Sequence, residues 1–161
     1  MSNVYWEEYN RPAKIYLGVD IGVNGGIVAL TETGAVIAAF KTPETRVEFI
    51  EKLKPFGEVP SFCILERVHS QPKNGGKANF SFGATTERTL FTLEICKIPF
   101  QEVTPQTWMK TYMLKKEKSE TSAQWKNRLK ARAQQIFPNE KITLWGADAF
   151  LMAEFCRRNY K

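Results

Sequence analysis

The sequence predicts an α/β domain built on a mixed five-stranded sheet with helices on its faces. Two observations support this class. Three short apolar runs separated by turn residues open the chain, and apolar strands then alternate with helical patterns. Strands joined by hairpins pair antiparallel, whereas strands joined through helices pair in parallel. The length of 161 residues fits an irregular N-terminal leader over residues 1–14 and a single domain over residues 15–161.

The first half of the chain supplies most of the predicted sheet. Thr33-Gly34 is a tight-turn signal between two apolar runs, and Pro43 and Glu44 stand where a helical pattern begins. Each predicted element is an apolar or periodic segment bounded by turn residues: strands over 15–22, 25–32, 35–42 and 61–68, and a helix over 43–54.

The second half is predicted to be mainly helical. A glycine-containing loop covers residues 69–79, and Pro105 stands at a helix start. Thr121 or Ser122 is a candidate N-cap for an amphipathic helix. The remaining predicted elements are one strand over 100–104 and helices over 80–96, 105–114, 121–137 and 146–160.

Composition narrows the function classes. Three separated cysteines and a single histidine argue against a disulfide framework, a zinc site and a multi-histidine metal centre. No apolar run is long enough to span a membrane, and the first residues lack a signal-peptide pattern, so a cytoplasmic location is expected. The net charge of +6 suits a polyanionic partner but does not by itself distinguish DNA, RNA and an acidic membrane.

Three carboxylates stand where packing alone would not place them. Asp20 ends one apolar strand, Glu66 ends the apolar run of another, and Asp148 lies in the first turn of the last helix. If the two strands are neighbours, Asp20 and Glu66 project to the same side of the sheet, and the last helix can bring Asp148 opposite them. Such a cluster of oxygen ligands favours Mg²⁺ or Mn²⁺, and two ions would support phosphodiester hydrolysis.

Other interpretations of these acids stay open at this point. Asp148 can complement a helix dipole, and Glu66 can pair with Arg67 or Arg88. The glycines of DIGVNGG, which follow the first strand, can also cradle a nucleotide phosphate, as in sugar kinases and actin-like ATPases. Those proteins close a second domain over ATP, and 161 residues leave no room for one.

Four segments together resemble the RuvC-like Holliday-junction resolvases of the phage and bacterial branch, within the RNase H-like superfamily. In order along the chain they are GVDIGVNGGIVAL, ILERVHSQP with the following NFSFG, VTPQTWMK, and GADAFLMAEFCRR. The resemblance spans about residues 15–158. It implies an RNase H-like fold and a homodimer, with Asp20, Glu66 and Asp148 as catalytic metal ligands for two Mg²⁺ or Mn²⁺ ions.

The activity that this resemblance implies is cleavage of Holliday junctions or related branched DNA. The enzyme would be a crossover junction endodeoxyribonuclease of a bacterial or phage-infected cell, acting in recombination, repair or phage genome processing, with no small-molecule cofactor. One position departs from the family pattern. Trp145 stands three residues before Asp148, where the family carries a further acid or histidine, and Glu140 is too distant to replace it. The alternative function is therefore a weakly active or inactive branched-DNA-binding protein of the same fold.

Several residues are candidates for DNA contacts or proton transfer. Lys73 and Lys77 lie in the loop after Glu66 and suit phosphates, while Phe80 can wedge between bases or pack in the core. His69 is a candidate for proton transfer or an ordinary loop residue. A basic run is the expected path of duplex arms, although it can be a solvated face: Lys110, Lys115, Lys116, Lys126, Lys130 and Arg132. Residues 80–96, with Leu90, Leu93 and Ile95, offer a candidate dimer surface or a cover for the sheet.

Overall fold

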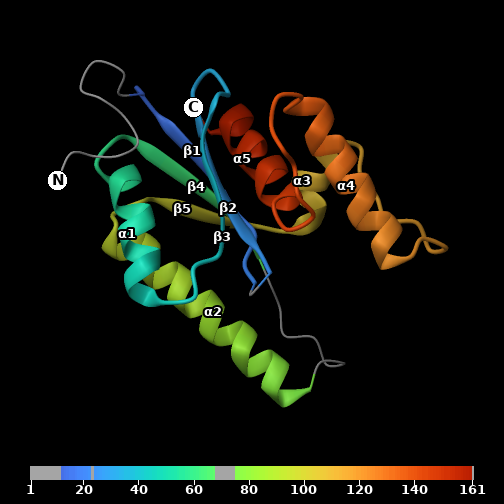
Figure 1. The fold of residues 1–161 in the computed structure, drawn as a ribbon, viewed down its shortest axis with the longest axis horizontal. Coiled ribbons are helices and arrows are strands. Elements are labelled where there is room, and N and C mark those ends of the chain that lie inside the picture. Colours follow the sequence, from blue (N-terminus) through green and yellow to red (C-terminus); the bar gives the residue numbers. More distant parts are fainter. Residues whose placement is uncertain (1–11, 23, 68–74, 161) are drawn as a thin grey trace.

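The structure, a computed structural model, describes residues 12–22, 24–67 and 75–160. They form one five-stranded sheet with the strand order β3-β2-β1-β4-β5 (Figure 1). The predicted mixed sheet is confirmed, since β1 pairs antiparallel with β2 and parallel with β4. The strand bounds are β1 Ile15–Val19, β2 Gly26–Thr31, β3 Val36–Lys41, β4 Ser61–Glu66 and β5 Phe100–Val103.

The connections between strands explain the pairing directions. A short turn in which Gly34 adopts a φ of +87° joins β2 to β3, and this positive φ requires a residue without a Cβ. The later strands are reached through helices, so β4 and β5 run parallel to β1. All three parallel strands therefore end at the same edge of the sheet, which we call the carboxyl edge.

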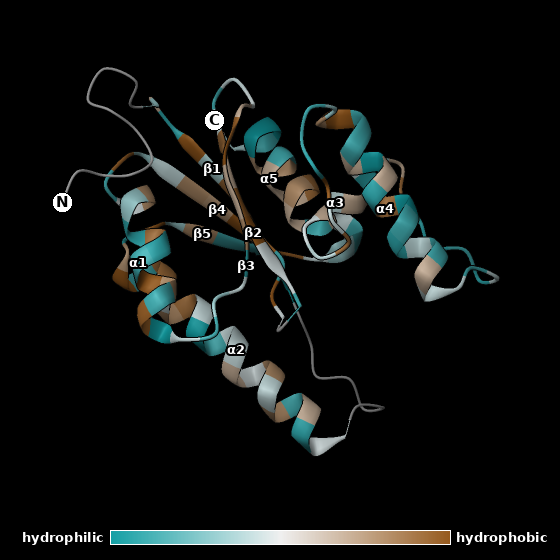
Figure 2. Ribbon diagram, viewed as in Figure 1, coloured by the Kyte–Doolittle hydropathy of each residue, from teal (hydrophilic) through white to brown (hydrophobic). Residues whose placement is uncertain are grey.

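Helices cover both faces of the sheet. In Figure 1, α1 and α2 lie on one side, and α3, α4 and α5 lie on the other. The helix bounds are α1 Arg46–Gly57, α2 Gly76–Ile95, α3 Pro105–Thr111, α4 Ser122–Ile136 and α5 Ala147–Asn159. The sheet separates two apolar cores, one against α1 and α2 and the other against α3, α4 and α5. Figure 2 shows that α4, the outermost helix of its layer, is largely hydrophilic.

The closest contact between a helix and the sheet occurs at Gly18. A Cβ on Gly18 would lie 2.2 Å from the backbone nitrogen of Ala153 and 2.4 Å from the carbonyl oxygen of Ala149, so only glycine permits this approach. Helix α5 is correspondingly well buried: it has nine buried residues, eight of them consecutive over 149–156, and all but Glu154 are apolar. The position of α5 over β1 therefore fixes where its first turn lies.

Several predicted boundaries differ from the structure by a few residues, and two of the differences have a clear local cause. The loop predicted over residues 69–79 gives way to α2 at Gly76, because Gly75 and Gly76 occupy the N-cap and first helical positions, where glycine is tolerated. The helix predicted from residue 43 begins at Arg46, since the Thr45 side chain accepts a hydrogen bond from the Glu48 amide and caps it. The cap predicted at Thr121 is confirmed, with a reciprocal bond to Gln124.

The candidate dimer surface on α2 divides between the core and solvent. Leu93 is buried and Leu90 packs against the same core, so these two cover the sheet. Phe91 and Ile95 stay exposed, as does Phe80 near the start of α2. Within the described ranges, none of the helices has the length and apolar character needed to cross a membrane.

Candidate active site

Strand register places two of the three predicted acids side by side. Val19 pairs with Leu65 in the parallel β1–β4 ladder, so Asp20 and Glu66 follow at the same level on neighbouring strands. The Asp20 amide donates to the carbonyl oxygen of Gly26, 3.0 Å away, which continues the β1–β2 ladder past the end of β1. Side chains alternate along strands, so both acids point to the face that α5 covers.

Helix α5 supplies the third acid from above this face. Ala149 and Ala153 of α5 lie against Gly18. Gly18 is two residues before Asp20 in the chain. Asp148, in the first turn, therefore lies toward the carboxyl edge. The three predicted acids come from three separate elements and meet at one end of the sheet, as their positions in the sequence predicted.

Burial and mutual repulsion disfavour the charged forms of these acids. Burial first, and then the charges of Asp148 and Glu66, raise the pKa of Asp20 to about 8. Burial raises the pKa of Glu66 to about 7, which a hydrogen bond from Trp108 lowers in part and the charge of Asp148 raises further. Burial raises the pKa of Asp148 to about 6. None of the three has an arginine partner in the described structure, and Lys126 is the cation whose charge opposes the shifts of Asp20 and Asp148.

The indole of Trp108 orients Glu66. Its Nε1–H donates a hydrogen bond of 3.1 Å to Oε2 of Glu66, and the side chain is fully buried in α3. The same ring belongs to the apolar core between the sheet and α3, α4 and α5. The hydrogen bond depends on the contact between the end of β4 and α3, for which the sequence gives no separate signal.

The chemistry of these side chains fits a hard divalent cation. Clustered carboxylates with raised pKa values gain a counter-charge when such an ion binds. Their positions are not those of a ready-made site, however. Among residues 12–22, 24–67 and 75–160, no group of three or more acid, histidine or cysteine side chains is arranged to hold a metal ion.

Trp145 lies beside this site. A Cβ on Gly26 would lie 2.6 Å from the Trp145 ring, so the indole packs directly on the start of β2. Gly26 also accepts the Asp20 amide hydrogen bond. The ring therefore occupies the region next to Asp20, where it offers no ligand oxygen or nitrogen.

The structure rejects the pairings of Glu66 with arginine. Arg67 lies 3.6 Å from Glu102 instead, and Arg88 donates a hydrogen bond of 2.6 Å to the backbone oxygen of Glu44. Glu66 accordingly has the Trp108 indole as its hydrogen-bond donor and is not neutralised by a neighbouring cation in the described structure.

The structure describes some of the predicted DNA-contact residues but not all of them. Lys73 and His69 lie outside the described residues, while Lys77 is exposed in the first turn of α2. Phe80 is 80% exposed, which rules out the core alternative for its side chain. Phe82 packs against the core below α1 and α2.

The basic run is spread over several surfaces. Lys110, Lys115 and Lys116 are exposed on α3 and the turn that follows it. In α4, Lys126 and Lys130 are one helical turn apart, and the charge of Lys126 acts to lower the pKa of Asp20 and of Asp148, so Lys126 lies near these acids.

The arginines of α4 hold local structure. Arg128 pairs with Glu120 at 2.9 Å and lies over the Trp125 ring, and Arg132 donates to Gln135. Of the predicted DNA contacts in α4, Lys126 is therefore the one that lies near the acids.

Comparison with known proteins was made by sequence and by structure. No protein-family model matches the chain, and no curated protein matches it in sequence. Two solved structures of RuvC from Thermus thermophilus match its fold. The fold of the chain is RNase H-like. RuvC in complex with a Holliday-junction substrate superposes with a TM-score of 0.59 at 12% identity, over 86% of this chain and 90% of that one. A second RuvC structure gives a TM-score of 0.53 at 14% identity over the same shares.

These matches support the expected resemblance at the level of fold. The phage and bacterial branch stays a prediction, because identities of 12–14% do not resolve it. Activity has to be argued from the residues of this chain.

Proposed function

We propose that this protein is a metal-dependent, structure-selective DNA endonuclease that cleaves Holliday junctions or related branched DNA. The observation that carries the proposal is the convergence of Asp20, Glu66 and Asp148 at the carboxyl edge, with raised pKa values and no arginine partner among the described residues. The fold adds support, since one of the similar structures is RuvC bound to a Holliday junction.

Each acid has a definite part in this proposal. Asp20, Glu66 and Asp148 would hold one or two Mg²⁺ or Mn²⁺ ions, which supply Lewis-acid activation of water and charge stabilisation at the phosphate. The Trp108 indole holds Oε2 of Glu66, which leaves Oε1 for the site. Lys126, near Asp20 and Asp148, presents a positive charge where an anionic backbone would enter. His69 is retained as a candidate for proton transfer.

The remaining parts of the proposal concern the partner. Lys77, Lys110, Lys115, Lys116 and Lys130 are exposed or partly exposed and suit phosphates, and exposed Phe80 suits insertion at an opened junction. Lys73 and Arg132 keep the same proposed role. A homodimer would present two such sites to a four-way junction, and the exposed residues Phe91 and Ile95 of α2 are available for its interface.

The test is cleavage of a synthetic four-way junction by the purified protein in Mg²⁺ or Mn²⁺. We expect symmetric nicking that falls on the order of a thousandfold in Asp20→Asn, because a bound metal contributes several kcal/mol at the phosphate. Glu51→Gln is the matched control, since Glu51 is an exposed acid of α1 outside the cluster. Equal rates for the wild type and Asp20→Asn would contradict the proposal.

Two observations favour a second candidate, a junction-binding protein that does not cleave. Trp145 fills the region beside Asp20 without offering a ligand, and the described acids do not form a ready-made metal site. Junction binding at nanomolar concentrations with no cleavage in either metal would support this candidate.

Replacing Trp145 tests what the indole does. Trp145→Asp adds a ligand beside the cluster, so activity at low Mg²⁺ should rise if the position faces the metals. The change should also cost about 3 kcal/mol of folding stability, because the ring packs on Gly26. Unaltered metal dependence in a folded variant would mean that position 145 lies outside the metal site.

A further inference from the structure

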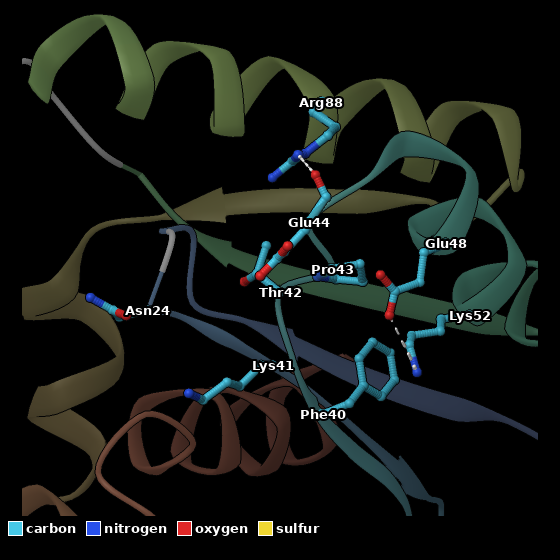
Figure 3. A pocket seen from close by; sticks show the side chains of 9 residues that line it. All are labelled: Asn24, Phe40, Lys41, Thr42, Pro43, Glu44, Glu48, Lys52 and Arg88. Carbon is cyan, nitrogen blue, oxygen red and sulfur yellow. Dashed lines mark hydrogen bonds and ion pairs between the residues drawn. The ribbon is translucent and has the colours of Figure 1, made fainter. Parts of the chain in front are cut away.

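A pocket lies beside the carboxyl edge on the sheet face opposite to α5. It has a volume of about 470 Å³ and lies between the end of β3, the start of α1 and the middle of α2 (Figure 3). Its lining is mainly polar and charged: Asn24, Phe40, Lys41, Thr42, Pro43, Glu44, Glu48, Lys52 and Arg88. The proposed catalytic acids do not line it.

The charges around this pocket leave a positive excess. Lys41, Lys52 and Arg88 stand against Glu44 and Glu48, so the lining carries a net charge of +1. Glu48 lies 3.9 Å from Lys52, and these two offset each other. Lys41 is exposed and makes no hydrogen bond or ion pair with the described residues, which leaves its charge available to a ligand.

Two polar atoms of the pocket wall lack partners. The Thr42 hydroxyl is buried, with 8% of the residue exposed, and has no hydrogen-bond partner among the described residues. The Arg88 Nε is also buried without a partner there, although Nη1 of the same guanidinium donates to the Glu44 carbonyl. Buried polar groups are usually hydrogen-bonded, so two unpartnered donors in one wall indicate a missing acceptor.

The pocket and the proposed catalytic acids lie at the same edge of the sheet, on its two opposite faces. Thr42 follows β3, and its amide donates to the carbonyl oxygen of Gly25 in the segment between Asp20 and β2. Asn24, from the same segment, forms one end of the pocket (Figure 3). Because β3 is two strands from β1, the pocket lies roughly 10 Å from the end of β1 along the carboxyl edge.

We propose that this pocket binds a backbone phosphate of the DNA strand near the one that is cut. A phosphodiester carries one negative charge, which matches the net charge of the lining, and its oxygens are acceptors for the Thr42 hydroxyl and the Arg88 guanidinium. Lys41 adds a cation at the rim. A phosphate held in the pocket would fix the position of the DNA strand relative to the carboxyl edge. This inference rests on the proposed DNA-binding function.

The test is the binding of a fluorescent four-way junction, measured by anisotropy in EDTA over a range of salt concentrations. Lys41→Gln should reduce the slope of log affinity against log salt by roughly one, because one phosphate contact is lost. Lys54→Gln removes the same charge from α1 outside the pocket and should leave the slope unchanged. Since Lys41 is exposed, its replacement should not prevent folding.

The hydroxyl provides a second, uncharged test. Thr42→Val should weaken junction binding roughly tenfold with an unchanged salt slope, because a hydrogen bond to a charged group is lost. Ser61→Ala is its control, since Ser61 carries another buried hydroxyl without a partner in the described structure, at the opposite end of the sheet.

The outcomes distinguish a failure of the phosphate-site proposal from a failure of the proposed DNA-binding function. One outcome is that the wild type binds with a steep slope of log affinity against log salt while Lys41→Gln and Thr42→Val behave like their controls. That result would contradict the proposal that the pocket binds a phosphate and leave the nuclease proposal standing. A wild type that does not bind the junction would overturn both. Effects confined to Lys41→Gln and Thr42→Val would support the phosphate site.

Discussion

Helix α5 carries two buried acids in opposite electrostatic surroundings. Glu154 is 3% exposed and receives hydrogen bonds of 2.6–2.8 Å from Arg157 and Arg158. Burial acts to raise its pKa, but the two arginines outweigh burial and lower it. Asp148, less than two turns earlier, has no such partner, and burial raises its pKa to about 6.

The difference separates an acid that stabilises the fold from the acids that we propose form a metal site. Arg157 also donates to the carbonyl oxygen of Glu32, so the Glu154 cluster fastens α5 to the β2–β3 turn. At the other end of α5, folding leaves Asp148 near Asp20 and Glu66, and among the described residues Lys126 is the cation whose charge opposes the raised pKa of Asp20 and of Asp148. An arrangement that costs stability without a ligand is expected where a cation binds.

Among these buried acids, the largest expected loss of stability on substitution is at Glu154. Glu154→Gln removes the charge that two arginines share, and we expect a loss of roughly 2–3 kcal/mol, reduced because both arginines are partly exposed. Urea unfolding measures it, with Glu94→Gln, an exposed acid of α2, as a control that should change little. Junction cleavage per folded molecule should stay at the wild-type level. A loss of less than 0.5 kcal/mol would show that the cluster does not stabilise the fold.

The charge of Asp20 should destabilise the metal-free protein, whereas the charge of Glu154 stabilises it. The Asp20 pKa of about 8 in the folded protein lies above the ordinary aspartate value of 3.8, so folding favours its protonated form. That contribution is complete below about pH 4 and is lost as the pH rises through about 8. The metal-free wild type should therefore lose stability relative to Asp20→Asn over this range, by roughly 5 kcal/mol. Urea unfolding in EDTA at several pH values tests this, and parallel profiles would contradict it.

A smaller effect is expected from the indole that orients Glu66. Trp108→Phe keeps an aromatic ring but removes the donor to Oε2, and metal affinity should fall roughly tenfold, as for other groups that orient metal ligands. Calorimetric titration with Mn²⁺ measures the change. Trp125→Phe is the control, because Trp125 packs with Arg128 in α4. Equal Mn²⁺ affinities in the two variants would mean that the hydrogen bond from Trp108 does not orient Glu66 for metal binding.

Sequence reasoning predicted the fold and the acids because their signals are local. Apolar runs, the turn at Gly34 and the helix cap at Thr121 each act within a few residues, and an acid that ends an apolar strand is visible without a structure. The start of α2 was misplaced because adjacent glycines suit a loop and a helix N-terminus equally.

Features that depend on contacts between distant segments were not predictable. The donation from Trp108 to Glu66 joins residues 42 positions apart, and the phosphate pocket combines β3, α1 and α2. The pairing of Arg67 with Glu102 likewise depends on β4 lying beside β5. No spacing in the sequence distinguishes these contacts from ordinary packing.

The most direct test of the central claim is thermal unfolding with and without Mn²⁺. If Asp20, Glu66 and Asp148 hold the ion, saturation at about 100 times the Kd should stabilise the wild type by roughly 2.7 kcal/mol. For a chain of this size the Tm should then rise by roughly 5–10 °C. Glu154→Gln should show the same rise from a lower starting Tm, and Asp20→Asn should show none. A wild type whose Tm does not respond to Mn²⁺, or an equal response in Asp20→Asn, would contradict the assignment of these acids as a metal site.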